Sequence, residues 1–244
     1  VSMGPARKSK VISEKDRKTT AYHESGHALV AHLMPGGSPI GKISIIARGQ
    51  AGGFTRWQQE DKSYASQEQL EAQIAAAMGG RAAEVIKVGD VTTGASNDFE
   101  QATSIAREMI MRLGMSEKLS NRSFGKRQGG AVFLGREMSE ERDYSLKTES
   151  IIDDEINRLL LEGEERANRL LKDHDKELEA IAGFLLEHET LDSDQFVAII
   201  DGKDPLLASP MVADKPSSSE DPSVPTNETE KEVSDSADPE LQAT

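Results

Sequence analysis

Apolar residues recur at three- and four-residue spacing in six stretches of this 244-residue chain, a pattern that predicts amphipathic helices. The first predicted helix follows Ser13, which with Asp16 resembles a capping box, and continues to about Met34. A second is expected to begin at Ser66, and a third at Asn97, where Glu100 completes a similar cap. The predicted helices after the first span about 66–86, 97–113, 139–172, 177–187 and 193–200.

A small β element is expected between the first two helices. The runs "KISIIA" (42–47) and "GGFTRW" (52–57) are rich in β-favouring residues and are joined by "RGQA", which predicts a hairpin or two adjacent strands. The segment "AVFLG" (131–135) is a further short strand candidate. The predicted fold class is therefore mainly α with a small β element of two or three strands.

The charge of the chain is concentrated near its C-terminal end. From Asp201 onward there are eleven acidic residues and three lysines, a net charge of −8 out of a total of −14. This segment has no aromatic residue and is rich in Pro and Ser, so it cannot bury enough apolar surface to offset the entropy of ordering. We therefore expect a flexible N-terminal segment (1–10), a folded part (11–200) and a disordered acidic tail (205–244).

Composition excludes several classes of function. A net charge of −14 disfavours binding to nucleic acid or to an anionic membrane surface. The chain contains no cysteine, so a metal would have to be held by His, Asp or Glu. No signal peptide is visible and no apolar run approaches the roughly 18 residues that span a bilayer, so the polypeptide is expected to be soluble.

The first predicted helix carries the pattern His-Glu-x-x-His at His23, Glu24 and His27. Two imidazoles four residues apart lie on one face of a helix and can converge on one Zn²⁺. Glu24 points about 100° away, where it can act as a base toward water near the metal. Both histidines share the apolar stripe of the helix, whereas His32 lies off it and is expected at the surface. The alternative is a helix with two histidines at the edge of the core.

The third metal ligand is left open by spacing alone. A metzincin would have Gly and His where Val30 and Leu33 stand, and a thermolysin-like site would need a helical Glu in the strand-forming region around Gln50. The remaining candidates are acidic residues near apolar helices. They are Glu84, Asp90, Asp98 and Glu100. Asp98 would be favoured by the dipole at the start of a helix, but an ordinary helix-start acid fits equally well, and Glu84 could be an ordinary surface acid.

The segment "GGSPIGKI" (36–43) nearly matches a phosphate-binding loop. Ile43 replaces the hydroxyl residue that would hold Mg²⁺, and the segment precedes a strand instead of connecting a strand to a helix. We interpret it as a connector between a helix and a strand.

Six segments together resemble the peptidase domain of the FtsH family of membrane-anchored, ATP-dependent zinc metalloproteases. They are "TAYHESGHALVA", "KISIIARG", "GGFT", "AAAMGGRAAEV", "TTGASNDFEQAT" and "GMSEKL". The resemblance runs from about Arg7 to Ile200 in the order and spacing of the family. Ala47 stands where many members have proline, a difference that does not affect the chemistry.

The resemblance implies one Zn²⁺ per chain, held by His23, His27 and Asp98, with Glu24 as the catalytic glutamate. It implies a zinc metallopeptidase domain over 11–200, with a catalytic part (11–115) and a helical part (116–200). The strand around "GGFT" would border the cleft and pair with an extended substrate.

The resemblance also carries expectations about the whole protein. Family members are homo-hexameric rings that use ATP through an AAA+ module, and both this module and the transmembrane anchor are absent from this chain. The expected function is hydrolysis of unfolded or membrane proteins at the cytoplasmic face of the bacterial inner membrane, or on the matrix or stromal side in an organelle. Two alternatives are an inactive ring-forming scaffold and a zinc hydrolase acting on small molecules.

Overall fold

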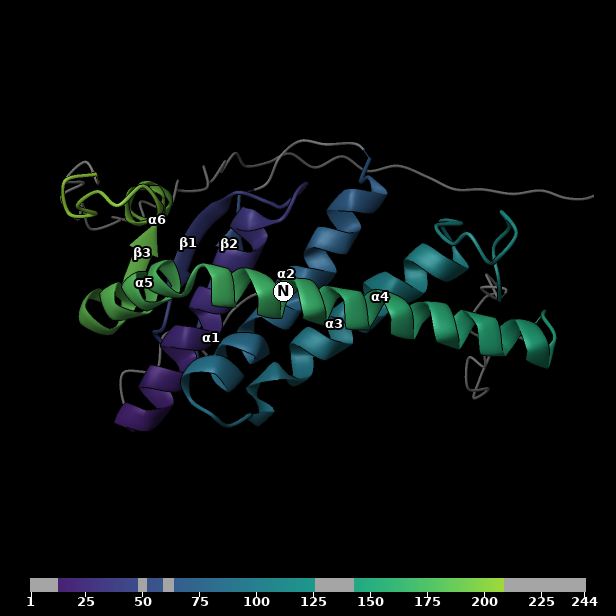
Figure 1. The fold of residues 1–244 in the computed structure, drawn as a ribbon, viewed down its shortest axis with the longest axis horizontal. Coiled ribbons are helices and arrows are strands. Elements are labelled where there is room, and N and C mark those ends of the chain that lie inside the picture. The colour runs from purple at the N-terminus through teal and green to yellow at the C-terminus, as the bar shows by residue number, and fades with distance from the viewer. Residues whose placement is uncertain (1–12, 48–51, 59–63, 126–142, 209–244) are drawn as a thin grey trace, which may run out of the picture. The chain divides into compact units, whose positions relative to one another are not determined.

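The computed structural model of the chain describes residues 13–47, 52–58, 64–125 and 143–208, all within one compact unit (Figure 1). The predicted N-terminal segment, the loop "RGQA", the strand candidate "AVFLG" and most of the predicted acidic tail lie outside these residues. Within the described ranges the fold is mainly α with a small sheet, as predicted.

Six α-helices are present in the described residues. They are α1 (Glu14–Leu33), α2 (Gln67–Lys87), α3 (Ser96–Met111), α4 (Leu146–Asp173), α5 (Asp175–His188) and α6 (Ser193–Ile200). Ser13 caps α1 by accepting from the backbone of Asp16, as predicted, although no reciprocal bond from Asp16 is present among the described residues. Ser66, the predicted start of the second helix, forms a reciprocal capping box with Gln69. None of these helices has the length and hydrophobicity needed to cross a bilayer.

One predicted cap and one predicted helix start are wrong. α3 begins at Ser96 without a side-chain cap, because a short 3₁₀ turn, η1 (Thr93–Ala95), precedes it and is capped by Thr92; the expected capping box of Asn97 and Glu100 does not form. α4 was expected from about residue 139, but residues 143–145 are not helical and Ser145 caps a helix that begins at Leu146.

The sheet has three antiparallel strands in the order β2-β1-β3. β1 (Ile40–Ser44) and β2 (Phe54–Trp57) form the predicted pair. The third strand, β3 (Thr190–Asp192), comes from the connection between α5 and α6. It has only three residues, of which Leu191 alone is fully buried, so it carries too little alternation to be recognised as a strand.

The crossing of α1 and α2 determines where the functional residues lie. Gly26 and Gly79 meet at this crossing: a Cβ on Gly26 would stand 2.3 Å from the carbonyl oxygen of Gly79, and one on Gly79 would stand 2.6 Å from that of Gly26. The Ala- and Gly-rich run of α2 therefore allows close packing against α1.

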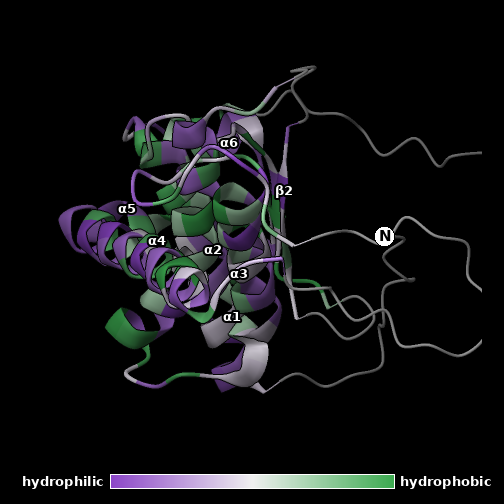
Figure 2. Cartoon of the chain, turned by 90° about the vertical axis from the view of Figure 1, so that its right-hand side faces the viewer, coloured by the Kyte–Doolittle hydropathy of each residue, from purple (hydrophilic) through white to green (hydrophobic). Residues whose placement is uncertain are grey.

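The remaining helices enclose this pair. α4 packs across α2 and α3, and α5 packs against α1 (Figure 1). Figure 2 shows hydrophobic residues prevailing on the central α2, whereas α4 is largely hydrophilic with hydrophobic positions interspersed. The core is largely aliphatic, with a few aromatic side chains such as Phe124 and Phe196, and includes residues of all six helices and of the sheet.

Candidate metal centre

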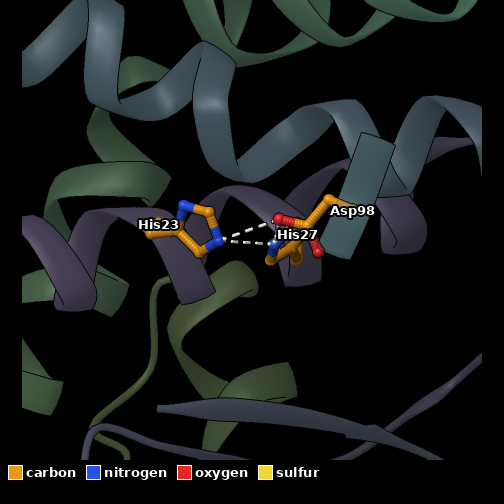
Figure 3. Close-up of side chains that lie close together, drawn as sticks. All are labelled: His23, His27 and Asp98. Atoms are coloured by element: carbon orange, nitrogen blue, oxygen red, sulfur yellow. Dashed lines mark hydrogen bonds and ion pairs between the residues drawn. The ribbon is translucent and has the colours of Figure 1, made fainter. Parts of the chain in front are cut away.

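Three side chains from two helices converge on one point (Figure 3). His23 and His27 project from successive turns of α1, and Asp98 reaches them from the first turn of α3. The two Nε2 atoms lie 3.0 Å apart, and Asp98 Oδ2 lies 3.2 Å from Nε2 of His23 and 3.5 Å from Nε2 of His27. One ligand atom from each residue lies within 4.8 Å of the others, so the group could hold a metal ion.

The hydrogen bonds of the two imidazoles assign their protons. Nδ1 of His27 donates to the carbonyl oxygen of Ala76 at 2.8 Å, because a carbonyl can only accept. Nδ1 of His23 faces the carboxylate of Glu84 at 2.7 Å, which is likewise an acceptor. An imidazole that carries its single proton on Nδ1 directs the lone pair of Nε2 inward. Buried Asp98 Oδ2 has no hydrogen-bond partner among the described residues. Three lone pairs meet, and a cation fits between them.

The charges around the cluster favour a positive centre. Burial opposes the charged form of His23, but the adjacent carboxylates of Asp98 and Glu84 outweigh it and raise the pKa of His23 to about 10, so the cluster favours a positive charge, whether a proton or a metal ion. Burial also opposes ionisation of Asp98, yet the two histidines hold the pKa of its carboxyl well below the usual range. The carboxylate is thus ionised and available as a ligand at neutral pH.

α2 supports both imidazoles from one face. Ala76, Gly80 and Glu84 stand four residues apart, and helical geometry places such residues in one row. The first supplies the carbonyl that orients His27, and the last contacts His23. Gly80 lies directly beneath the rings, because a Cβ there would come within 2.5 Å of Nε2 of His27. The glycine is required for this close approach.

Glu84 is 1% exposed, so the interpretation as an ordinary surface acid is wrong. It contacts His23 on the side away from the cluster and accepts from the backbone N–H and hydroxyl of Thr92 at 2.8 Å and 3.2 Å. Burial raises its pKa, but these hydrogen bonds outweigh it and lower the pKa below the ordinary value. Glu84 therefore orients His23. The other two open candidates, Asp90 and Glu100, are exposed and are not in the metal-binding group.

Glu24 lies beside the cluster but is not part of it. Its side chain is buried, and its Oε2 accepts from the hydroxyl of Thr55 on β2 at 2.9 Å. Burial raises the pKa of Glu24, although nearby His27 and His23 and the hydroxyl partly oppose the shift. A carboxylate with a raised pKa accepts a proton more readily than an exposed one, which suits a group that takes up a proton and passes it on.

A cavity of about 950 Å³ opens over these residues. His23, Glu24, His27 and Asp98 all line it, together with residues of β2 and η1. His32, in contrast, is exposed, as predicted, and its ring packs edge-on against Phe196 at 5.3 Å. The structure thus brings His23, Glu24, His27 and Asp98 together around one cavity and leaves His32 outside it.

Comparison with known families decides what kind of protein carries this site. The family model of Peptidase family M41 matches residues 10–199. The chain belongs to peptidase family M41. The matched residues include every described element from α1 through β3 and nearly all of α6. The M41 match also includes both predicted parts of the folded region, although their division at residue 115 stays a prediction.

Relatives of this M41 chain are similar over most of its length. The chain is 46% identical over 202 residues to the ATP-dependent zinc metalloprotease FtsH 1 of Thermomicrobium roseum, covering 82% of this chain and 31% of that protein. The chain is 45% identical to the ATP-dependent zinc metalloprotease FtsH of Bacillus subtilis, over 82% of this chain and 32% of that protein. It is also 45% identical to the chloroplastic ATP-dependent zinc metalloprotease FTSH of Medicago sativa, over 84% of this chain and 30% of that protein. The chain spans about a third of the length of these relatives.

Proposed function

We propose that this chain is a zinc-dependent endopeptidase whose metal is held by Nε2 of His23, Nε2 of His27 and Oδ2 of Asp98. The observation that carries the proposal is the convergence of three lone pairs within 3.0–3.5 Å, with each imidazole proton committed to an acceptor on α2. Two imidazoles and a carboxylate are a ligand set that suits zinc and leaves a position open. Membership of family M41 and the names of the relatives support zinc as the metal.

Glu24 would move the proton during hydrolysis. Zinc, when bound, supplies Lewis acidity that lowers the pKa of a water molecule and polarises the scissile carbonyl. Glu24, held beside the ligands and lining the same cavity, takes the proton from the attacking water. It then delivers that proton to the nitrogen of the leaving amine, so the carboxylate is regenerated. The raised pKa of Glu24 matches this shuttling role.

The cavity suits an extended polypeptide. β2 is an edge strand of the three-stranded sheet, and Gly53, Phe54 and Thr55 line the cavity. A substrate strand laid along β2 would be held by backbone hydrogen bonds, which carry little sequence preference. We propose that unfolded polypeptides bind in this way.

The wider setting of the activity is also a proposal. The relatives named above are ATP-dependent zinc metalloproteases, and the chain covers about a third of their length. We infer that an ATPase module feeds unfolded or membrane proteins to this site in a homo-hexamer anchored in a membrane. The site would lie on the cytoplasmic side in a bacterium, or on the matrix or stromal side in an organelle. The net charge of −14 argues against nucleic acid as a partner.

The substitution Glu24→Gln tests the function. It keeps the shape of the side chain but removes the base, so we expect zinc content to be unchanged and cleavage of casein to fall by about 10²-fold or more. Glu14→Gln, an exposed glutamate in the first turn of the same helix, is the matched control and should leave both unchanged.

Three results would count against the proposal. If the Glu24→Gln variant cleaved casein at the full rate, Glu24 would not be the general base. Cleavage that persists in the unsubstituted chain after a chelator has removed its metal would exclude a metallopeptidase. A zinc-loaded chain that cleaves neither casein nor short peptides would favour the inactive scaffold.

A further inference from the structure

We propose that Thr55 is a positioning residue that fixes the orientation of the Glu24 carboxylate. This inference rests on the proposed function, since it assumes that Glu24 is the base. It concerns the sheet, which contributes no metal ligand among the described residues.

The register of the sheet directs Thr55 toward α1. Thr55 on β2 is paired with Ile43 on β1, and directly paired residues present their side chains on the same face. Ile43 is 0% exposed, so this is the covered face of the sheet. β2 packs against α1 there, and the Thr55 hydroxyl reaches Glu24 across the gap.

The hydroxyl has a single proton and two acceptors on Glu24. Oγ1 of Thr55 lies 2.9 Å from the carboxylate oxygen Oε2 and 3.3 Å from the backbone carbonyl oxygen of Glu24. The shorter contact is to the charged group, and hydrogen bonds to ionised acceptors are the stronger ones. Donation to Oε2 therefore fixes the rotation of the carboxylate about its terminal bond.

The second oxygen of the Glu24 carboxylate, Oε1, lies beside Gly53, the residue directly before β2. A Cβ on Gly53 would stand 2.9 Å from Oε1 of Glu24 and 2.7 Å from the carbonyl oxygen of Ser44, so only glycine fits at this place. The hydroxyl of Thr55 thus holds one carboxylate oxygen, and Gly53, directly before β2, leaves room beside the other. Gly53, Thr55 and Glu24 all line the cavity. Oε1 is then the oxygen that accepts the proton of the attacking water.

The kinetic test uses a substitution that removes only the hydroxyl. In Thr55→Val, loss of one hydrogen bond to a charged group is expected to lower kcat for a fluorogenic peptide about 10- to 100-fold, with KM and zinc content unchanged. Thr55→Ser keeps the hydroxyl and should restore most of kcat. Thr190→Val makes the same change on β3, outside the cavity, and should leave kcat unchanged.

A second measurement is independent of activity. Thr55→Val alone should lower Tm, because it leaves the buried carboxylate of Glu24 with one hydrogen-bond donor fewer. In a chain that already carries Glu24→Ala, the same substitution should not lower Tm. An equal fall in Tm in both backgrounds would show that Thr55 acts on the sheet alone.

Three kinetic results would contradict the role of Thr55. Full kcat in Thr55→Val, or an equal loss in Thr55→Ser, or loss of zinc with kcat, would overturn the inference. Failure of the proposed function is distinguishable from this, because it would appear in chains that retain Thr55. Cleavage would then persist after chelation of the metal or in the Glu24→Gln variant.

Discussion

The two imidazoles of the candidate metal centre each make a second contact that fixes the orientation of the ring. His27 donates to a backbone carbonyl, which no side-chain substitution removes, whereas His23 depends on the carboxylate of Glu84. Glu84 is itself anchored by Thr92 at the start of η1. Its charge stabilises the imidazole that it contacts, and outer contacts of this kind raise the basicity of a metal-binding histidine.

The substitution Glu84→Gln tests this arrangement. It keeps the shape and one acceptor for His23 but removes the charge, so we expect the affinity for zinc to fall about 10- to 100-fold. The measurement is competition for zinc with a chelator of known affinity. Glu68→Gln, at an exposed position in the first turn of the same helix, should have no effect. Unchanged affinity in Glu84→Gln would show that His23 is positioned without it.

The individual site residues differ in how far the sequence reveals them. His23, Glu24 and His27 fall within five residues of one helix, so helical periodicity alone places them together. Asp98 was suggested only by the family resemblance, because spacing offered four acidic candidates. The roles of Glu84 and Thr55 were not predicted, since their contacts with α1 span 61 and 31 residues of sequence and depend on tertiary packing.

α2 is the element that makes the centre possible without supplying a ligand. Three residues on one side of α2 face the two imidazoles. Ala76 supplies a carbonyl oxygen, Gly80 leaves space for the rings because it has no side chain, and Glu84 supplies a carboxylate. The glycine lowers helix propensity by roughly 1 kcal/mol relative to alanine, a cost that the close approach of two imidazoles explains.

The substitution Gly80→Ala is expected to disrupt the centre. The new Cβ would stand 2.5 Å from Nε2 of His27, so a ring must move and zinc content should fall below half. Stability should fall by about 1–3 kcal/mol in urea unfolding, as for overpacked cores. Gly183→Ala in α5 is the control, because nothing lies within 4 Å of its Cβ and helix propensity should make it neutral or stabilising. A stable, zinc-loaded Gly80→Ala protein would contradict the role given to this glycine.

The secondary elements show which physical signals a sequence carries. Helices with a regular apolar stripe were predicted well: α6 has the predicted bounds, and α1 and α2 agree within one residue at each end. The start of α3 also agrees within one residue, but the 3₁₀ turn η1 before it was missed, because such a turn has no hydrophobic period of its own. β3 was missed because it owes its structure to pairing with β1.

The chain as a whole brings together proposed ligands that are far apart in sequence. Asp98 follows His27 by 71 residues (98 − 27), and α2 packs against both α1 and α3. A bound zinc ion would therefore link two helices that share a neighbour. α4, in the predicted helical part, packs against α2 and α3 of the predicted catalytic part. The boundary between these parts, and the predicted disorder of 205–244, stay predictions.

The zinc-to-protein ratio of the purified chain, measured with and without Asp98→Asn, tests the central claim most directly. We expect about one zinc per unsubstituted chain. Asp98→Asn removes the negative charge of one ligand, so it should lower the ratio to well below half after dialysis, while Asp90→Asn at an exposed position leaves it unchanged. An unsubstituted chain without zinc, or an Asp98→Asn chain that keeps a full equivalent, would contradict the site described here.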